Sequence, residues 1–87
     1  MEKLINEFNS MDSMPIFEIN IEDAFYVYYI QATEKGLEAG GCSNTGFMAM
    51  DLEYIEWDNR FSLNEHLEEL YEVCYFDAVE EYKGEQS

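Results

Sequence analysis

Residues 62–83 read SLNEHLEELYEVCYFDAVEEYK and carry the clearest structural signal in the chain. Ser62 and Glu65 form the S-x-x-E pattern of a capping box, in which each side chain bonds a free backbone amide at the start of a helix. Apolar residues then recur at helical spacing, at Leu63, Leu67, Leu70, Cys74 and Ala78. The pattern predicts a long amphipathic helix from Leu63 to about Lys83, which Gly84 would end.

Upstream of this helix the apolar period changes to two, which is typical of strands. Residues 16–21 alternate apolar and polar side chains, and Glu22-Asp23 fits a tight turn. Residues 24–33 are rich in aromatic and β-branched residues, as expected of a more central strand. Glu34-Lys35-Gly36 predicts a hairpin turn with the glycine at positive φ, followed by a short third strand at residues 37–39.

Residues 40–46 (GGCSNTG) predict an uncharged loop whose glycines take unusual φ angles. The fourth strand is expected at residues 47–57. Within it, Met48, Met50, Leu52 and Tyr54 would share one face, with Asp51 and Glu53 opposite. Beyond Tyr54 the apolar phase moves to Ile55 and Trp57, which indicates a bulge or a break in the strand.

Residues 1–13 are expected to form a short helical extension, because Leu4, Ile5, Phe8 and Met11 have helical spacing and Pro15 prevents its continuation. With residues 15–57 as strands and 62–83 as a helix, the chain is predicted to be a single domain. Its fold class is α+β: a four-stranded antiparallel meander packed by the long C-terminal helix, with a short N-terminal helix.

The composition describes an acidic but foldable chain of 87 residues, 47% hydrophobic, with a formal net charge of −16. Direct binding to nucleic acid is not expected, since phosphate contacts need Lys and Arg and only four are present. No apolar run is long enough for a membrane span, and the N-terminus does not resemble a signal peptide. We therefore expect a cytoplasmic protein without a membrane partner, in which Cys42 and Cys74 are reduced.

Motifs for catalysis or metal binding are missing from the sequence. His66 has no recognisable catalytic partner and, among glutamates in the first helical turn, is expected to be solvated. The carboxylates around Asp51 lack the glycine and spacing of a calcium loop, and residues 40–46 lack the G-K-[ST] of a phosphate-binding loop. We expect no enzymatic activity, no catalytic or metal-ligating residue and no cofactor.

Acidic residues are concentrated between Asp51 and Glu81, where Arg60 is the one formal positive charge. On the predicted helix they form like-charge pairs three and four residues apart, which together cost about 1–3 kcal/mol. Small domains have only about 4–13 kcal/mol of stability, so a function for the charge is favoured over simple solvation. The residues expected to contact a partner are Asp51, Glu53, Glu56, Asp58, Glu65, Glu68, Glu69, Glu72, Phe76, Asp77 and Glu80.

Carboxylates on a helix stand about 5–6 Å apart at four-residue spacing, similar to the roughly 7 Å between successive phosphates of one DNA strand. In size, charge and aromatic content the chain resembles the small acidic DNA-mimic inhibitors of phages and mobile elements. These include antirestriction proteins, anti-CRISPR proteins and inhibitors of uracil-DNA glycosylase. The resemblance is one of profile, without a shared motif. It implies that the partner is a basic nucleic-acid-binding protein, such as a nuclease or a DNA-repair enzyme.

Other interpretations remain open at this point. An acidic adaptor, an immunity protein or an antitoxin could dock on a basic partner without imitating nucleic acid. A homodimer could cover the apolar residues among the acids. An acidic domain from a halophilic organism would have the same charge, although the aromatic richness argues against it.

Overall fold

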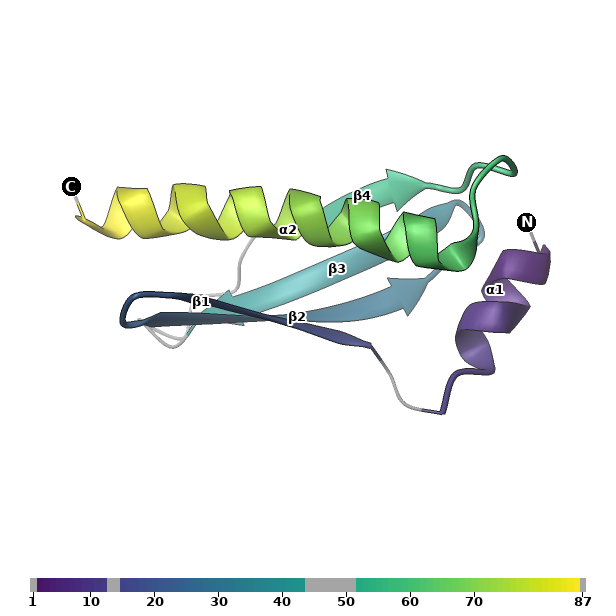
Figure 1. Cartoon of the computed structure of the whole chain (residues 1–87), viewed down its shortest axis with the longest axis horizontal. Coiled ribbons are helices and arrows are strands. Elements are labelled where there is room, and N and C mark those ends of the chain that lie inside the picture. The colour runs from purple at the N-terminus through teal and green to yellow at the C-terminus, as the bar shows by residue number, and fades with distance from the viewer. Residues whose placement is uncertain (1, 13–14, 44–51, 87) are drawn as a thin grey trace.

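The computed structural model describes residues 2–12, 15–43 and 52–86 and has the predicted order of elements. These are α1 (Glu2–Asn9), β1 (Ile16–Ile21), β2 (Ala24–Ala32), β3 (Gly36–Ser43), β4 (Glu53–Glu56) and α2 (Leu63–Gln86). The strands form one antiparallel sheet in the order β1-β2-β3-β4, and α2 lies over one face, roughly along the strands (Figure 1). The predicted α+β meander with two helices is confirmed.

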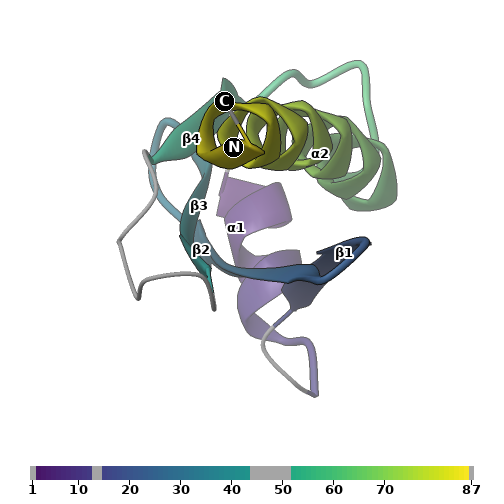
Figure 2. The ribbon, with the colours of Figure 1, turned by 90° about the vertical axis from the view of Figure 1, so that its left-hand side faces the viewer.

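The core lies between the sheet and α2. Viewed along the helix, the sheet curves from β4 to β1 around α2, and α1 closes the far end (Figure 2). Strand β2 supplies Tyr26, Tyr28 and Ile30, which are fully buried beneath the helix. Leu70 and Cys74 of α2 meet them, and both side chains are also fully buried. Alternation on β2 and helical spacing on α2 therefore produce one continuous apolar layer.

The start of α2 has the predicted capping box. The Ser62 amide donates to Glu65 Oε1 at 3.1 Å, and the Glu65 amide donates to Ser62 Oγ at 3.2 Å. The predicted end is wrong, because the helix continues through Gly84 to Gln86. A single glycine in a helix costs only about 1 kcal/mol, which does not enforce a stop. Neither helix in the described part of the chain is long and apolar enough to cross a membrane.

Strand β3 is longer than the sequence suggested. A loop was predicted to start at Gly40, but residues 40–43 belong to β3 instead. Gly40 and Gly41 pair with Tyr29 and Tyr28 of β2. Residues 44–46 lie outside the described residues. Glycine is required at position 41 because it lacks a side chain, not because the backbone takes a positive φ. A Cβ there would lie 2.6 Å from the Tyr28 ring. A glycine in a strand often marks such a close approach.

The turn between β2 and β3 is organised by Thr33. Its hydroxyl accepts hydrogen bonds from the amides of Lys35 and Gly36, at 3.2 and 3.1 Å. Gly36 does not take the predicted positive φ, which occurs instead at Glu22 in the β1–β2 turn, with φ of 51°. Trp57 fastens the Thr33 turn to β4, because its indole N–H donates to the Thr33 carbonyl at 2.8 Å.

The predicted apolar face of β4 at Leu52 and Tyr54 is wrong, and so is the bulge or break after Tyr54, because Glu53–Glu56 pair with β3 in regular register. The apolar phase at Ile55 and Trp57 is as predicted. Ile55 and Trp57 point into the core, whereas Leu52 and Tyr54 are exposed, by 64% and 40%. Glu53 shares the face of Ile55 and is therefore on the helix side of the sheet, not on an outer face. The first part of the predicted strand, including Met48, Met50 and Asp51, lies outside the described residues.

Candidate protein-interaction surface

A stripe of exposed side chains follows the side of α2 that faces away from the sheet. With about 100° of rotation per residue, positions 65, 69, 72, 76 and 80 fall close together on one side of a helix. We call this stripe the acidic face; its members, all exposed, are Glu65, Glu68, Glu69, Glu72, Phe76 and Glu80. These are the predicted site residues that the structure brings together.

Phe76 interrupts the acidic face with a large apolar side chain. It is 66% exposed, and the neighbouring Tyr75 ring lies edge-on at 6.2 Å. Tyr71, Glu72, Tyr75 and Phe76 line a shallow surface hollow of about 380 Å³. An exposed aromatic among charged groups is typical of the centre of a protein interface.

Glu53 and Asp77, also predicted to contact a partner, do not lie on the acidic face. Both are partly buried at the boundary between the sheet and α2. Asp77 Oδ2 accepts a hydrogen bond of 2.8 Å from the hydroxyl of Tyr28. Burial, this hydrogen bond and nearby negative charges, including that of Glu53, hold the pKa of Tyr28 above its ordinary value. These two carboxylates act inside the fold.

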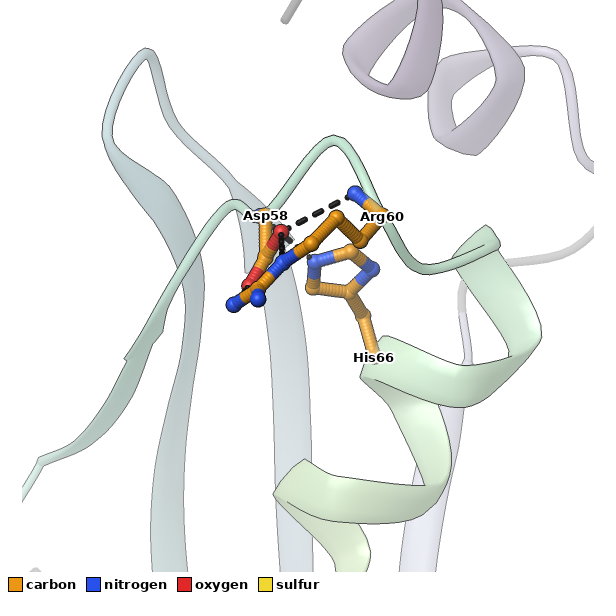
Figure 3. Close-up of polar contacts among 3 residues, drawn as sticks. All are labelled: Asp58, Arg60 and His66. Carbon is orange, nitrogen blue, oxygen red and sulfur yellow. Dashed lines mark hydrogen bonds and ion pairs between the residues drawn. The ribbon is translucent and has the colours of Figure 1, made fainter.

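Asp58 lies apart from the acidic face and is paired with Arg60. The guanidinium donates to Asp58 Oδ1 at 3.1 Å and to Oδ2 at 2.7 Å, and the Arg60 amide adds a bond of 2.9 Å to Oδ1 (Figure 3). These hydrogen bonds lower the pKa of the Asp58 carboxyl to about 2. The pair presents little net charge to a partner.

His66 is buried, so its predicted solvation is wrong. The side chain is 1% exposed and points from the first turn of α2 toward the segment at Asp58 (Figure 3). The Asp58 amide donates to Nε2 at 2.9 Å, which assigns the ring proton to Nδ1, donating to the Ser62 carbonyl at 2.7 Å. Trp57 packs edge-on at 5.1 Å. The imidazole therefore joins the β4–α2 connection to the helix, with both nitrogens bonded to backbone.

The remaining predicted residues lie elsewhere. Glu56 is exposed on β4. It is two residues after Tyr54, so both side chains project from the sheet face away from α2. Asp51 lies outside the described residues. In the described part of the chain, no three His, Cys, Asp or Glu side chains are arranged to hold a metal ion.

A group that sequence reasoning missed is the polar cluster beneath α2. Tyr28 and Asp77, joined by a hydrogen bond, and Glu53 lie near Cys74, whose side chain is fully buried. Burial and the charges of Glu53 and Asp77 raise the pKa of the Cys74 thiol to about 12. The sequence periodicity predicts that Tyr28 and Cys74 face the core. It does not predict that Glu53 lies near them, because this depends on which residues of β4 face α2.

This cluster predicts a loss of stability in alkaline solution. A thiol titrates near 9.0 when unfolded and near 12 in the fold. Below pH 9 it is protonated in both states. Between about pH 9 and 12 only the unfolded state loses the proton, so the free energy of unfolding falls with rising pH. Urea unfolding at pH 8 and pH 11 should show a smaller fall for Cys74→Ala than for the unchanged protein. Equal falls would contradict the assignment.

Comparison with known proteins gives no assignment: no family model matches the sequence, and no curated protein or solved structure is significantly similar to it.

Proposed function

We propose that this protein is an inhibitor that imitates nucleic acid and occupies the Lys/Arg-lined groove of a basic DNA- or RNA-binding protein. The observation that carries the proposal is the acidic face of α2. Its five glutamates are exposed, and the structure gives them no cationic partner within the described residues. The negative field therefore projects outward from an ordered helix.

The spacing of the acidic face suits this role. Residues four apart on a helix are separated by about 6 Å along its axis. Successive phosphates of one DNA strand are roughly 7 Å apart when the helical path is included. Glu65, Glu69, Glu72 and Glu80 run along the axis in one stripe. A groove whose cations are spaced for phosphates would meet a carboxylate at comparable intervals.

Cations of the chain lie mostly away from the acidic face. Arg60 is bound to Asp58, Lys3 is on α1, and Lys35 is in the turn between β2 and β3. Lys83 is near the end of α2. The first three turns of the helix, which precede Phe76, therefore offer an acidic surface to a basic partner. Such complementarity speeds association and weakens with added salt.

Competition for DNA tests the proposal. A labelled DNA duplex is bound to each member of a panel of restriction, CRISPR and DNA-repair enzymes, and fluorescence anisotropy follows its release as the protein is added. We expect release from at least one enzyme, with an affinity that falls steeply between 50 and 300 mM salt. Ternary complexes containing DNA, enzyme and this protein would contradict mimicry for the enzyme concerned.

The hollow at Phe76 favours a second candidate function, an acidic docking module that binds a basic partner without imitating nucleic acid. Phe76 would then be the main anchor and the glutamates would surround it. The substitution Phe76→Ala distinguishes nucleic-acid mimicry from an acidic docking module. Mimicry predicts that DNA competition survives this substitution with a modest loss, whereas a docking module would lose most of its affinity and leave DNA in place.

A further inference from the structure

Strand β1 is an open edge of the sheet. It pairs with β2 on one side, and among the described helices and strands it contacts only β2 and α2. Alternate N–H and C=O groups of Ile16–Ile21 therefore point away from β2, where the described chain places no further strand. The sequence IFEINI contains no Lys or Pro, two residues that commonly protect an edge, and its one charged residue is Glu18. This edge is a template for an added strand.

A groove of about 560 Å³ lies between this edge and the helix. Phe17 of β1 contributes one wall, and α2 contributes Asn64, Leu67, Glu68, Tyr71 and Glu72. Phe17 and Tyr71 meet edge-on, with ring centroids 5.2 Å apart. Figure 2 shows the side on which β1 and α2 approach each other. The groove thus combines apolar surface from Phe17, Leu67 and Tyr71 with two carboxylates.

We propose that an extended segment of a partner protein, with arginine at alternate positions, adds to β1 as a fifth strand and inserts its arginines into this groove. The proposal goes beyond nucleic-acid mimicry and does not depend on it, although it uses two members of the acidic face, Glu68 and Glu72. In this proposal the partner is recognised by its backbone hydrogen bonds with β1 and by the alternation of its arginine side chains.

The geometry matches an alternating pattern. Residues i and i+2 of a strand point to the same face and are about 6.6–6.8 Å apart. Glu68 and Glu72 are one helical step of four residues apart, about 6 Å along the axis. Because α2 lies roughly along the strands, two successive inward side chains of the added strand would face one carboxylate each (Figure 1).

Arginine suits the inward positions better than lysine or a purely apolar residue. Its aliphatic stem packs on apolar surface, and its guanidinium stacks on aromatic rings and binds carboxylates with two hydrogen bonds. Phe17 and Tyr71 supply the rings, and Glu68 and Glu72 supply the carboxylates. Outward positions would neighbour Ile16, Glu18 and Asn20, all exposed, where a small β-former such as threonine fits.

The test uses the full chain and a labelled peptide, Arg-Thr-Arg-Thr-Arg-Thr-Arg, with both ends blocked. A peptide of equal composition, Arg-Arg-Thr-Thr-Arg-Arg-Thr, keeps the charge but breaks the alternation. A third peptide carries N-methyl groups on alternate backbone amides, so it cannot form the strand ladder. Fluorescence anisotropy gives the three affinities, and NMR hydrogen exchange follows the amides of Ile16–Ile21.

We expect the alternating peptide to bind about tenfold more tightly than either control. The N-methylated peptide loses backbone hydrogen bonds with β1, and the rearranged peptide loses ion pairs of inward arginines with Glu68 and Glu72. Outward-pointing amides of β1 should become protected from exchange. Equal affinities for all three peptides, without protection of β1, would reduce the interaction to charge attraction and overturn the proposal. Undetectable binding of the alternating peptide, or tighter binding of a helix-forming Ala/Arg peptide, would also overturn it.

Variants of the protein locate the binding. Glu68→Gln with Glu72→Gln should weaken the alternating peptide about fivefold, as expected for two exposed ion pairs. Glu69→Gln with Glu80→Gln removes the same charge from the other side of the acidic face and should have a smaller effect. Equal losses for the two double variants would place the peptide on the acidic face instead of in the groove. Because DNA competition uses a different readout, failure of one proposal is distinguishable from failure of the other.

Discussion

Gly36→Ala is expected to lower the free energy of unfolding by about 3 kcal/mol, although it adds only one methyl group. A Cβ at this position would overlap the Ile55 carbonyl oxygen and lie 2.9 Å from the Glu56 Cα. Both contacts are with backbone, so no side-chain rotation relieves them. Strands β3 and β4, which pair Gly36 with Glu56, would have to separate. Urea or thermal unfolding at pH 7 measures the effect.

Gly40→Ala is the matched control on the same strand. A Cβ at Gly40 meets no atom within 4 Å, and the backbone there is already extended. Alanine reduces the conformational freedom of the unfolded chain, so this change should raise stability by about 0.5–1 kcal/mol or leave it unaltered. If both variants lost stability equally, the approach of β4 to Gly36 would not be the cause.

The helix could be predicted from sequence because its signals are local. The capping box needs only Ser62 and Glu65, and the apolar spacing from Leu63 to Ala78 defines the buried side. The same periodicity puts the glutamates of the acidic face on the opposite side of the helix. The end of the helix was not predictable in this way, because a lone glycine is compatible with both an end and a continuation.

The inward face of the fourth strand could not be predicted, because apolar residues occupy both odd and even positions and so project to both faces of the sheet. Leu52 and Tyr54 compete with Ile55 and Trp57, and only packing against α2 decides which pair is buried. Because the inward-facing residues were wrongly predicted, Glu53 was placed on the outer face of the sheet instead of on the face toward α2. This error also hid the polar cluster around Cys74, since that cluster needs Glu53 beneath the helix.

His66 illustrates a different limit. Its neighbours in sequence are glutamates, which suggests a solvated position, but its hydrogen bonds are with backbone atoms of Ser62 and Asp58. Backbone partners have no sequence signature. Asp58 likewise attracted attention as a free carboxylate, whereas its bonds with Arg60, two residues later, define its environment. Single charged residues in turns therefore need a structure before they can be assigned to a surface.

The helix keeps its acidic face at a cost to its own stability. Glu65, Glu68, Glu69 and Glu72 form four like-charge pairs at three- and four-residue spacing, each unfavourable by about 0.2–0.5 kcal/mol at low salt. Glu65 recovers part of this through the capping box and its place at the helix N-terminus. Within the described part of the chain, the side chains of the other three make no hydrogen bond or ion pair. Retaining them is understandable if a partner binds them.

The triple substitution Glu68→Gln, Glu69→Gln, Glu72→Gln is therefore expected to change stability and binding in opposite directions. Removing all four repulsive pairs should raise the free energy of unfolding by about 1–2 kcal/mol in 20 mM salt. Losing three ion pairs with a basic groove should weaken displacement of DNA from the target enzyme about 100-fold. Urea unfolding and the anisotropy competition measure the two effects on the same preparation.

Glu7→Gln, Asp12→Asn and Glu34→Gln together form the matched control, because they remove the same charge from exposed positions on α1 and in turns. This control should leave both stability and DNA displacement nearly unchanged. If it weakens displacement as much as the triple substitution on α2 does, the net charge of −16 attracts the partner without a defined surface. If the α2 variant gains stability and displaces DNA as before, the acidic face is a solvated surface and the proposed function is wrong.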